Sequence, residues 1–309
     1  MPNSCASIEI VLRVGAVNGE RPGWDDARGR LYFVDMRAPA LHRFDPATRA
    51  HDWWGMPDWI GTFGILADGR LALALRTGLH LFDPATGALR LLAPAPYDPR
   101  RFCFNDGRCD RQGRLIVGPM FHPLDPGDPR PDEPQTAPTW RFDGQSRMEP
   151  LSLVPAKTAN GLAFSPDGRT LYHTDTARKT VWACDYDPLT GAVEDQRVFA
   201  QVEEGGESGG PDGATVDADG FYTCAVFGAG CLLRFDPDGR VERRIELPVR
   251  YPTMPALGGP DLATMYVTSA AYPVKNRADH PDAGALLAFE APCRGLPASY
   301  MPPIQEPAS

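Results

Sequence analysis

The stretch PDGRTLYHTD at residues 166–175 sets a Pro-Asp-Gly turn directly before a strand rich in apolar and aromatic residues. The same pattern returns five times along the chain. The other copies are ARGRLYFVD (27–35), ADGRLALAL (67–75), RQGRLIVGP (111–119), ADGFYTCAV (218–226) and the weaker DLATMYVTS (261–269). Their starts lie roughly 40 to 55 residues apart, and a period of that size indicates an array of small structural units. The sequence therefore predicts six units that cover nearly the whole chain.

Each unit is predicted to contain four strands. The first turn precedes the second strand, and a turn of the Asp-Pro type follows the third strand in most units. These later turns are HRFDPAT (42–48), HLFDPATG (80–87), CDYDPLTG (184–191) and LRFDPDG (233–239). Proline presets φ in such turns and glycine supplies positive φ, so the pattern is typical of antiparallel hairpins.

Six four-stranded units that close into a ring form a β-propeller, in which closure protects the edges of the sheets. The sequence contains no amphipathic helix of 12 residues, which disfavours a helical solenoid. We therefore expect residues 1–309 to form one all-β domain, a six-bladed β-propeller with four antiparallel strands per blade. Its core is expected at about residues 8–292, and the apolar strand at 8–14 is expected to complete the last blade.

The composition excludes several classes of protein. The net charge is −9 and the Lys and Arg residues are scattered, so no nucleic-acid partner is expected. No run of 18 apolar residues occurs and the N-terminus does not resemble a signal peptide, so we expect no membrane partner and a cytoplasmic location. The seven cysteines are odd in number and lack a C-x-x-C spacing, so they are expected to be reduced.

Four of the six units place an oxygen-bearing side chain at one register position, the expected start of the innermost strand. Three lie eight residues before the turn glycine and the last lies nine before it: Asn105, Asn160, Asp212 and Glu20. The other two units offer Gly61 and Pro255. Taken singly, Asn-Gly and Asp-Gly are ordinary turn sequences. Around a common axis, however, two carboxylates and two amides suit a hard divalent cation.

Longer stretches around these residues carry a family resemblance. They are NGERPGWDDARGRLYFVD (18–35), RFCFNDGRCDRQGRLIVGPM (101–120), ANGLAFSPDGRTLYHTDT (159–176), GGPDGATVDADG (209–220) and GGPDLATMYVTSA (258–270). Together they resemble the gluconolactonase and regucalcin (senescence marker protein) family. The resemblance implies a six-bladed propeller that hydrolyses sugar lactones to aldonic acids, with one metal ion held by Glu20, Asn160 and Asp212. It also implies that Asn105 lies beside the metal and helps to hold water or substrate.

One position departs from the family pattern. The family commonly has an arginine that contacts substrate two residues before its Asn-Asp-Gly motif, and this chain has Cys103 there. A cysteine facing the mouth of the channel is expected to enlarge the substrate site or to accept a less polar substrate. A nucleophilic role for Cys103 is disfavoured because the sequence places no histidine partner beside it.

The predicted activity is that of a metal-dependent hydrolase that opens a lactone, a small-molecule substrate, to its hydroxy acid. Asp212 is the candidate for accepting the proton of the attacking water, and a hydroxide generated at the metal is the alternative. The ion is calcium, zinc, magnesium, manganese or ferrous iron, because all accept oxygen ligands. The alternatives are a phosphotriesterase-like hydrolase on the same metal site and a non-catalytic metal-binding propeller. A strictosidine-type enzyme is disfavoured, because those related propellers usually lack these metal residues. The oligomeric state stays open.

Loops between the second and third strands are expected to overhang the site. The one at 121–139 contains six prolines and is interpreted as a stiff lid. His122 opens it and is a candidate for binding a substrate hydroxyl. Trp59 and Phe63 flank the position without an oxygen in the second unit, where core packing is the default interpretation and an apolar wall of the site is the alternative.

Overall fold

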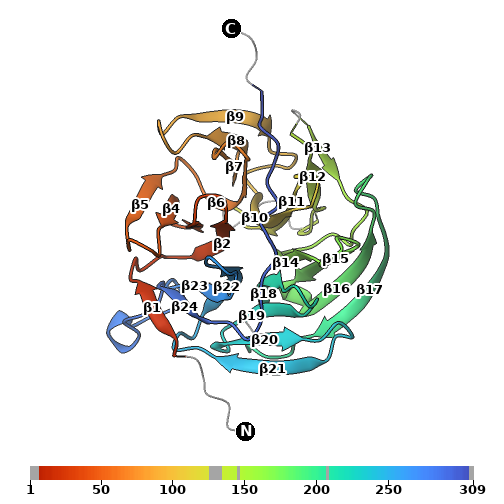
Figure 1. Ribbon diagram of the computed structural model, residues 1–309. Helices are drawn as coiled ribbons and strands as arrows, with labels where there is room; N and C mark the ends of the chain where they lie inside the picture. Colours follow the sequence, from red (N-terminus) through yellow and green to blue (C-terminus); the bar gives the residue numbers. More distant parts are fainter. Residues whose placement is uncertain (1–6, 125–133, 145–146, 207–208, 306–309) are drawn as a thin grey trace.

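The computed structural model describes residues 7–124, 134–144, 147–206 and 209–305. These residues form six four-stranded antiparallel sheets that surround a central axis as the blades of a propeller (Figure 1). In five of the sheets, four consecutive strands follow one another from the axis outward. The predicted fold class is confirmed.

The first blade contains β2 (Gly19–Asp25), β3 (Arg30–Asp35), β4 (Ala40–Phe44) and β5 (His51–Gly55). The second blade contains β6 (Ile60–Ile65), β7 (Leu71–Leu75), β8 (Gly78–Phe82) and β9 (Leu89–Pro94). The third blade contains β10 (Phe102–Cys109), β11 (Leu115–Phe121), β12 (Trp140–Phe142) and β13 (Met148–Pro150).

The fourth blade contains β14 (Ala159–Phe164), β15 (Thr170–Asp175), β16 (Thr180–Tyr186) and β17 (Val193–Gln201). The fifth blade contains β18 (Gly210–Val216), β19 (Tyr222–Phe227), β20 (Cys231–Phe235) and β21 (Val241–Glu246).

The sixth blade joins the two ends of the chain. It contains β22 (Pro252–Gly258), β23 (Thr264–Ser269), β24 (Leu286–Glu290) and, as its outermost strand, β1 (Glu9–Leu12). β1 pairs antiparallel with β24, as expected for the strand at 8–14. The described chain also has two single-turn 3-10 helices, η1 (Thr176–Arg178) and η2 (Arg277–Asp279), and neither is long or apolar enough to cross a membrane.

Burial decreases from the axis outward. Every residue of β6 and β7 is buried, whereas β21 is almost entirely exposed. The aromatic residues of the repeated strand fill the space between blades, and Tyr32, Phe33 and Tyr222 are among the largest fully buried side chains. Three cysteines are fully buried in this core: Cys184, Cys224 and Cys231.

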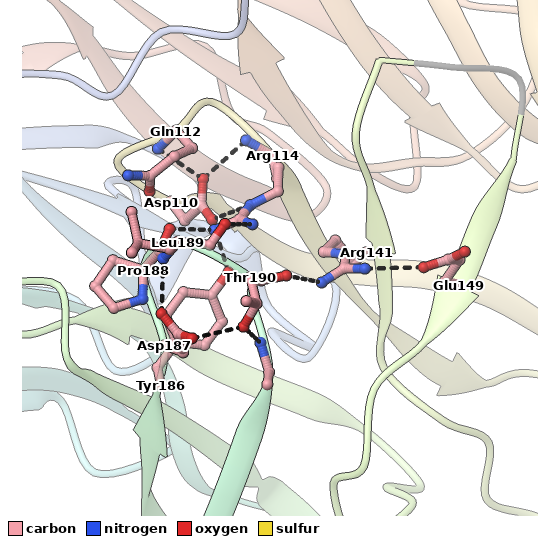
Figure 2. Close-up of polar contacts among 11 residues, drawn as sticks. Asp110, Gln112, Arg114, Arg141, Glu149, Tyr186, Asp187, Pro188, Leu189 and Thr190 are labelled. Carbon is pink, nitrogen blue, oxygen red and sulfur yellow. Dashed lines mark hydrogen bonds and ion pairs between the residues drawn. The ribbon is translucent and has the colours of Figure 1, made fainter.

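Neighbouring blades are joined by the two turns that define the repeat. Figure 2 shows Asp110, in the first turn of the third blade, next to the Asp-Pro turn of the fourth. Asp110 accepts hydrogen bonds from the backbone N–H and the Nε of Arg114 (2.9 and 2.6 Å) and from the Tyr186 hydroxyl (2.6 Å). Arg114 then donates to the carbonyl oxygens of Pro188 and Leu189 (2.7 and 3.1 Å). The turn residues therefore hold adjacent blades in register as well as reversing the chain.

The C-terminal segment crosses the end of the channel on which these hairpin turns lie, as the dark blue chain in Figure 1 shows. The N–H of Met301 donates to the Ile65 carbonyl, and the Met301 carbonyl accepts from Ala67, both over the second blade (2.8 and 2.9 Å). The Met301 side chain is fully buried, and the Tyr300 hydroxyl donates to Asp25 in the first blade (2.8 Å). The core expected at about 8–292 did not include this segment.

Candidate active site

The four predicted oxygen-bearing residues lie at irregularities in the innermost strands. In each case the ladder to the second strand slips, and the slips fall between Glu20 and Gly23, Phe104 and Gly107, Asn160 and Ala163, and Pro211 and Ala214. A β-bulge bends the strand and re-aims side chains next to it. The repeated bulge is the local structure behind the common register in the sequence.

In the sixth blade the irregularity lies at Thr253, whereas the count from the turn selected Pro255. Pro255 pairs regularly with Val267. After its irregularity, β22 has five residues paired with the second strand of its blade, whereas β18 has three. Counting back eight residues from the turn therefore selects a residue two positions beyond the irregularity in β22. Thr253 does carry an oxygen, but its hydroxyl donates to the Gly19 carbonyl (2.5 Å) and so ties the sixth blade to the first.

Asn105 and Asn160 are in direct contact. The Nδ2 of Asn105 donates to Asn160 Oδ1 (2.8 Å) and to the Ala159 carbonyl (2.9 Å). Asn160 Nδ2 donates to the Thr176 hydroxyl, which donates to the Pro211 carbonyl (2.8 Å each). Both asparagines are about 95% buried, and this chain of hydrogen bonds joins the third, fourth and fifth blades next to Asp212.

Asp212 is a buried carboxylate and Glu20 is half-buried. Loss of solvent is the main cause that raises the pKa of both groups, and the negative charge of Asp106 raises the pKa of both further. The Asp212 carboxylate also raises the pKa of Glu20, which indicates that the two groups, from the first and fifth blades, lie near one another. Among the described residues, neither carboxylate forms an ion pair, so no described cation neutralises them.

Glu20 is positioned by residues that sequence reasoning missed. Asn18 Nδ2 donates to Glu20 Oε1 (3.4 Å), and the backbone N–H of Asn18 donates to Asp35 (3.0 Å). The Oδ1 of Asn18 is buried and lacks a hydrogen-bond partner in the described chain. A buried carbonyl oxygen without a donor next to an unneutralised carboxylate is a site that attracts a cation or a water molecule.

A divalent cation fits this donor set in chemistry. The described residues contain no cluster of three or more His, Cys, Asp or Glu side chains suited to hold a metal. The predicted ligands differ from such a cluster because only Glu20 and Asp212 are carboxylates, and the third, Asn160, is an amide. An amide oxygen has two lone pairs, so Asn160 Oδ1 can accept from Asn105 and still face a cation. Two carboxylates and neutral oxygens are typical ligands of hard divalent ions.

Cys103 is an inert thiol in this environment. Its side chain is 1% exposed, and burial raises the pKa of the thiol to about 12. Arg76 and Arg37 oppose this shift through their charge, which places both guanidinium groups near the sulfur. A thiol that stays protonated at neutral pH is a poor nucleophile.

His122 and Trp59 meet at the end of the channel that carries the predicted site residues. Their ring centres are 4.3 Å apart, and both side chains are half-buried. Burial and the charges of Arg37 and Arg76 lower the pKa of His122, so its ring is neutral at pH 7. Phe63 is instead fully buried in the core.

The predicted lid at 121–139 is described only in part, since residues 125–133 lie outside the described chain. Phe121 ends β11, and Ala137 forms a bridge to Ala156 in the segment before β14. A role in substrate choice stays a prediction.

Sequence reasoning also missed Arg37 and Arg76. Both come one or two residues after the second strand of a blade, where loops return to the mouth. The signal that was available is their shared position just after the repeated strand in the first and second units. Both guanidinium groups lie over the Trp59 ring, at 5.1 and 4.9 Å from its centre.

Residues 18–271 match the family described as SMP-30/Gluconolactonase/LRE-like region, and the chain belongs to this family. The resemblance stated from the sequence is confirmed.

Two curated relatives are named as lactonases. The chain is 36% identical over 289 residues to 6-deoxy-6-sulfogluconolactonase of Pseudomonas putida, covering 91% of this chain and 94% of the relative. It is 33% identical over 282 residues to L-arabinolactonase of Azospirillum brasilense, covering 90% of each. A solved structure of calcium-binding regucalcin from Agrobacterium tumefaciens superposes with a TM-score of 0.86 at 27% identity, covering 97% of this chain and 98% of that one. These relatives confirm the prediction of a lactone hydrolase at the level of the family.

Proposed function

We propose that this chain is a cytoplasmic hydrolase that opens a sugar lactone to its hydroxy acid with one divalent metal ion. The observation that carries the proposal is the pair of carboxylates, Asp212 buried and Glu20 half-buried, that no cation among the described residues neutralises in a fold shared with lactonases. The six free thiols among the described cysteines support the location in a reducing compartment.

Glu20, Asn160 and Asp212 are the proposed metal ligands. The regucalcin neighbour, described as calcium-binding, supports a hard ion such as calcium, and magnesium, manganese, zinc and ferrous iron suit the same oxygens. A bound divalent ion supplies Lewis acidity at the lactone carbonyl, which is worth several kcal/mol at the transition state.

The amide of Asn105 is proposed to orient water or substrate. Both of its N–H groups are used, one by Asn160 Oδ1 and one by the Ala159 carbonyl. Its own carbonyl oxygen is therefore left as an acceptor, suited to the proton of a water molecule or a sugar hydroxyl. The contact to Asn160 fixes the direction of this acceptor relative to the proposed ligands.

Asp212 is the proposed acceptor of the proton from the attacking water. The water oxygen forms a bond to the carbonyl carbon, the bond from that carbon to the ring oxygen breaks, and the ring oxygen takes up a proton as the hydroxyl of the product. Asp212 returns the proton it accepted, so the enzyme is unchanged after one turnover. Cys103 takes no part, because its thiol stays protonated.

The test is acid release from a panel of aldonolactones after the protein has been stripped with chelator and reloaded with each ion in turn. We expect metal-dependent turnover that falls by about 10³-fold or more in Asp212→Asn. The matched control is Asp219→Asn, because Asp219 is an exposed carboxylate at the other end of the same hairpin.

Metal binding without turnover of any lactone would contradict the proposal. Phosphotriesters would then be tested next, and failure with both substrate classes leaves a non-catalytic metal-binding propeller.

A further inference from the structure

A cluster of cationic and aromatic side chains stands beside the proposed metal ligands. We call it the arginine cluster and define it by Arg37, Trp59, Arg76, His122 and Tyr272. The Arg37 guanidinium lies over the Tyr272 ring at 4.0 Å and over the Trp59 ring at 5.1 Å. Burial raises the pKa of the Tyr272 hydroxyl and the Asp212 and Glu20 carboxylates raise it further, in agreement with a position of the cluster beside the acidic site.

The loop that carries Arg37 is held by the same carboxylate as the segment that carries Glu20. Asp35 Oδ1 accepts from the backbone N–H groups of Arg37 and Ala38 (3.1 and 3.0 Å) and from that of Asn18 (3.0 Å). Asn18 in turn donates to Glu20. Arg37 is therefore fixed relative to the proposed metal ligand, as a group that recognises one end of a substrate must be.

Arg76 is a second cation, buried and held by backbone. Its Nη1 donates to the carbonyl oxygens of Pro99, Phe102 and His122 (3.2, 3.4 and 3.2 Å), and the residue is only 3% exposed. Its Nη2 is buried and has no hydrogen-bond partner among the described residues. Three carbonyl oxygens thus accept from Nη1, whereas the Nε and the Nη2 of this buried guanidinium have no hydrogen-bond partner among the described residues.

The positive charge of the cluster exceeds its negative charge. Within the described chain, Asp58 is the one carboxylate that pairs with these arginines, at 3.7 Å from the Nε of Arg76. Asp58 already accepts the backbone N–H of Trp59 (2.7 Å). Arg37 forms no ion pair with a described residue, and its Nε is buried without a partner. Arg76 is buried with only this long ion pair, and Arg37 is half-buried with none among the described residues, so the cluster is suited to receive an anion.

The neighbour of this cluster is the small side chain of Cys103, at the position where the family pattern has an arginine. Arg37 and Arg76 come from the first and second blades, and their charge lowers the pKa of the Cys103 thiol in the third, which indicates that both lie in its surroundings. The chain therefore has two cations near this position, supplied by loops of other blades.

We propose that the arginine cluster binds an acidic substituent of the lactone, a sulfonate, phosphate or carboxylate carried away from the ring carbonyl, with Arg37 as the main contact. This inference rests on the proposed function and defines its substrate class as anionic sugar lactones. Arg76 adds charge from behind Trp59, and the neutral ring of His122 contributes one N–H donor. Arg37 is a specificity-determining residue in this scheme and takes no part in opening the ring.

The first experiment compares kcat/KM for four lactones: neutral gluconolactone and its analogues with a sulfonate, a phosphate or a carboxylate at C6. We expect the wild-type chain to favour at least one anionic lactone, and Arg37→Met to lower kcat/KM for that lactone about 50-fold while changing gluconolactone less than threefold. Arg37→Lys keeps the positive charge but lacks the planar guanidinium, so its kcat/KM for the anionic lactone is expected to lie between those of the wild type and Arg37→Met. Arg240→Met, on an exposed turn far from the mouth, is the control for loss of one positive charge.

A second readout does not depend on turnover. The chain loaded with Ca²⁺ is titrated with gluconate and with 6-phosphogluconate, which share the acid at C1 and differ only at C6. We expect 6-phosphogluconate to bind more tightly to the wild-type chain and to lose that advantage in Arg37→Met. Equal binding of the two acids, or an equal loss of both in the variant, overturns the proposal.

The two proposals fail in different ways. A chain that hydrolyses gluconolactone with no preference for any anionic lactone contradicts the arginine cluster as a substrate site and leaves the lactonase intact. A chain that hydrolyses no lactone contradicts the lactonase, and the titration then decides on the anion site by itself. Thermal melting of each variant separates loss of fold from loss of binding.

Discussion

The two ends of the central channel differ in charge and in closure. At the mouth, Glu20 and Asp212 bring carboxylates with raised pKa values together. At the other end, Arg21 and Arg108 border a cavity of about 130 Å³ that the C-terminal segment 296–299 also lines. Burial, and the nearby charge of Arg108, lower the pKa of Arg21 to about 9. Carboxylates therefore lie at the mouth together with the arginine cluster, whereas Arg21 and Arg108 border the cavity at the closed end.

Residues that are close in the sequence contribute side chains to the two opposite ends of the channel. Glu20 and Arg21 are adjacent, and Arg21 has a positive φ of 50° at the β2 bulge. Asp106 and Arg108 lie two residues apart on β10, next to the irregularity between Phe104 and Gly107. A bulge changes the alternation of side chains along a strand, so one short segment can contribute side chains to both ends. The mouth therefore carries the proposed ligands, and the far end is covered by the C-terminal segment.

Separate substitutions of the adjacent residues Glu20 and Arg21 test whether the two ends of the channel differ in function. We expect Glu20→Gln to lower kcat/KM about 10³-fold or more, because it removes a proposed metal ligand. Arg21→Met, with a side chain of similar length, is expected to keep kcat/KM within about threefold. Steady-state kinetics with a saturating divalent ion measures both. Equal loss in the two variants would show that the ends are not separate in function.

A substitution in the C-terminal segment tests whether this segment closes the far end of the channel. Met301 is fully buried in the core shared by the second and third blades. We expect Met301→Ala to lower the free energy of unfolding by about 3 kcal/mol, from lost burial and the cavity left behind. Chemical denaturation measures this loss, and kcat measured well below the melting temperature should stay near that of the wild type. A loss of kcat without a loss of stability would contradict the assignment of this end to closure.

His173 lies on β15 of the fourth blade, between the two ends of the channel. Its protonation therefore tests how acid affects the stability of the fold alone. His173 is 1% exposed, and burial lowers its pKa to about 4 from an ordinary value near 6.5. The unfolded chain therefore binds the proton more tightly, so the stability present above pH 6.5 is lost as the pH falls toward 4. We expect this group to cost about 2 kcal/mol at pH 5.

His173→Phe keeps the stacking on Trp182 and cannot take up a proton. Unfolding free energies of the wild-type chain and this variant at pH 7 and pH 5 give the contribution of His173 as a difference. An identical decrease in both proteins would contradict the prediction.

The smallest expected effect is that of Cys103 at the mouth. Because its thiol is buried and stays protonated, Cys103→Ala is expected to change kcat by less than about threefold. Iodoacetamide at neutral pH should leave the wild-type activity unchanged for the same reason. Rapid inactivation by the reagent would show that the sulfur is reactive after all.

The sequence predicted the blades well because each repeat carries its own turn chemistry, and local signals survive in a single sequence. The register of Asn105, Asn160 and Asp212 was readable because bulge and turn keep a constant spacing in three blades. The count missed Thr253 because β22 is longer beyond its bulge.

Other parts of the site depend on how the blades are arranged. Arg37 and Arg76 share a position just after the repeated strand, but nothing in the sequence indicated that both guanidinium groups lie over the Trp59 ring. The C-terminal segment around Met301 carries no copy of the repeat, so its packing across the channel left no periodic signal. The sequence therefore predicted the strand pairing within each blade but did not predict these contacts between blades.

The pairing of β1 with β24 sets an order for folding during synthesis. β1 (Glu9–Leu12) is translated long before β24 (Leu286–Glu290), the strand with which it pairs. At a rate of roughly 5 to 20 residues per second, β1 waits on the order of 15 to 60 s for β24. During that time the backbone edge of β1 has no partner strand in its own sheet, and an unpaired edge can pair with another chain. The sixth blade, which contacts the first through Thr253 and Gly19, forms only after β22 to β24 have been synthesised.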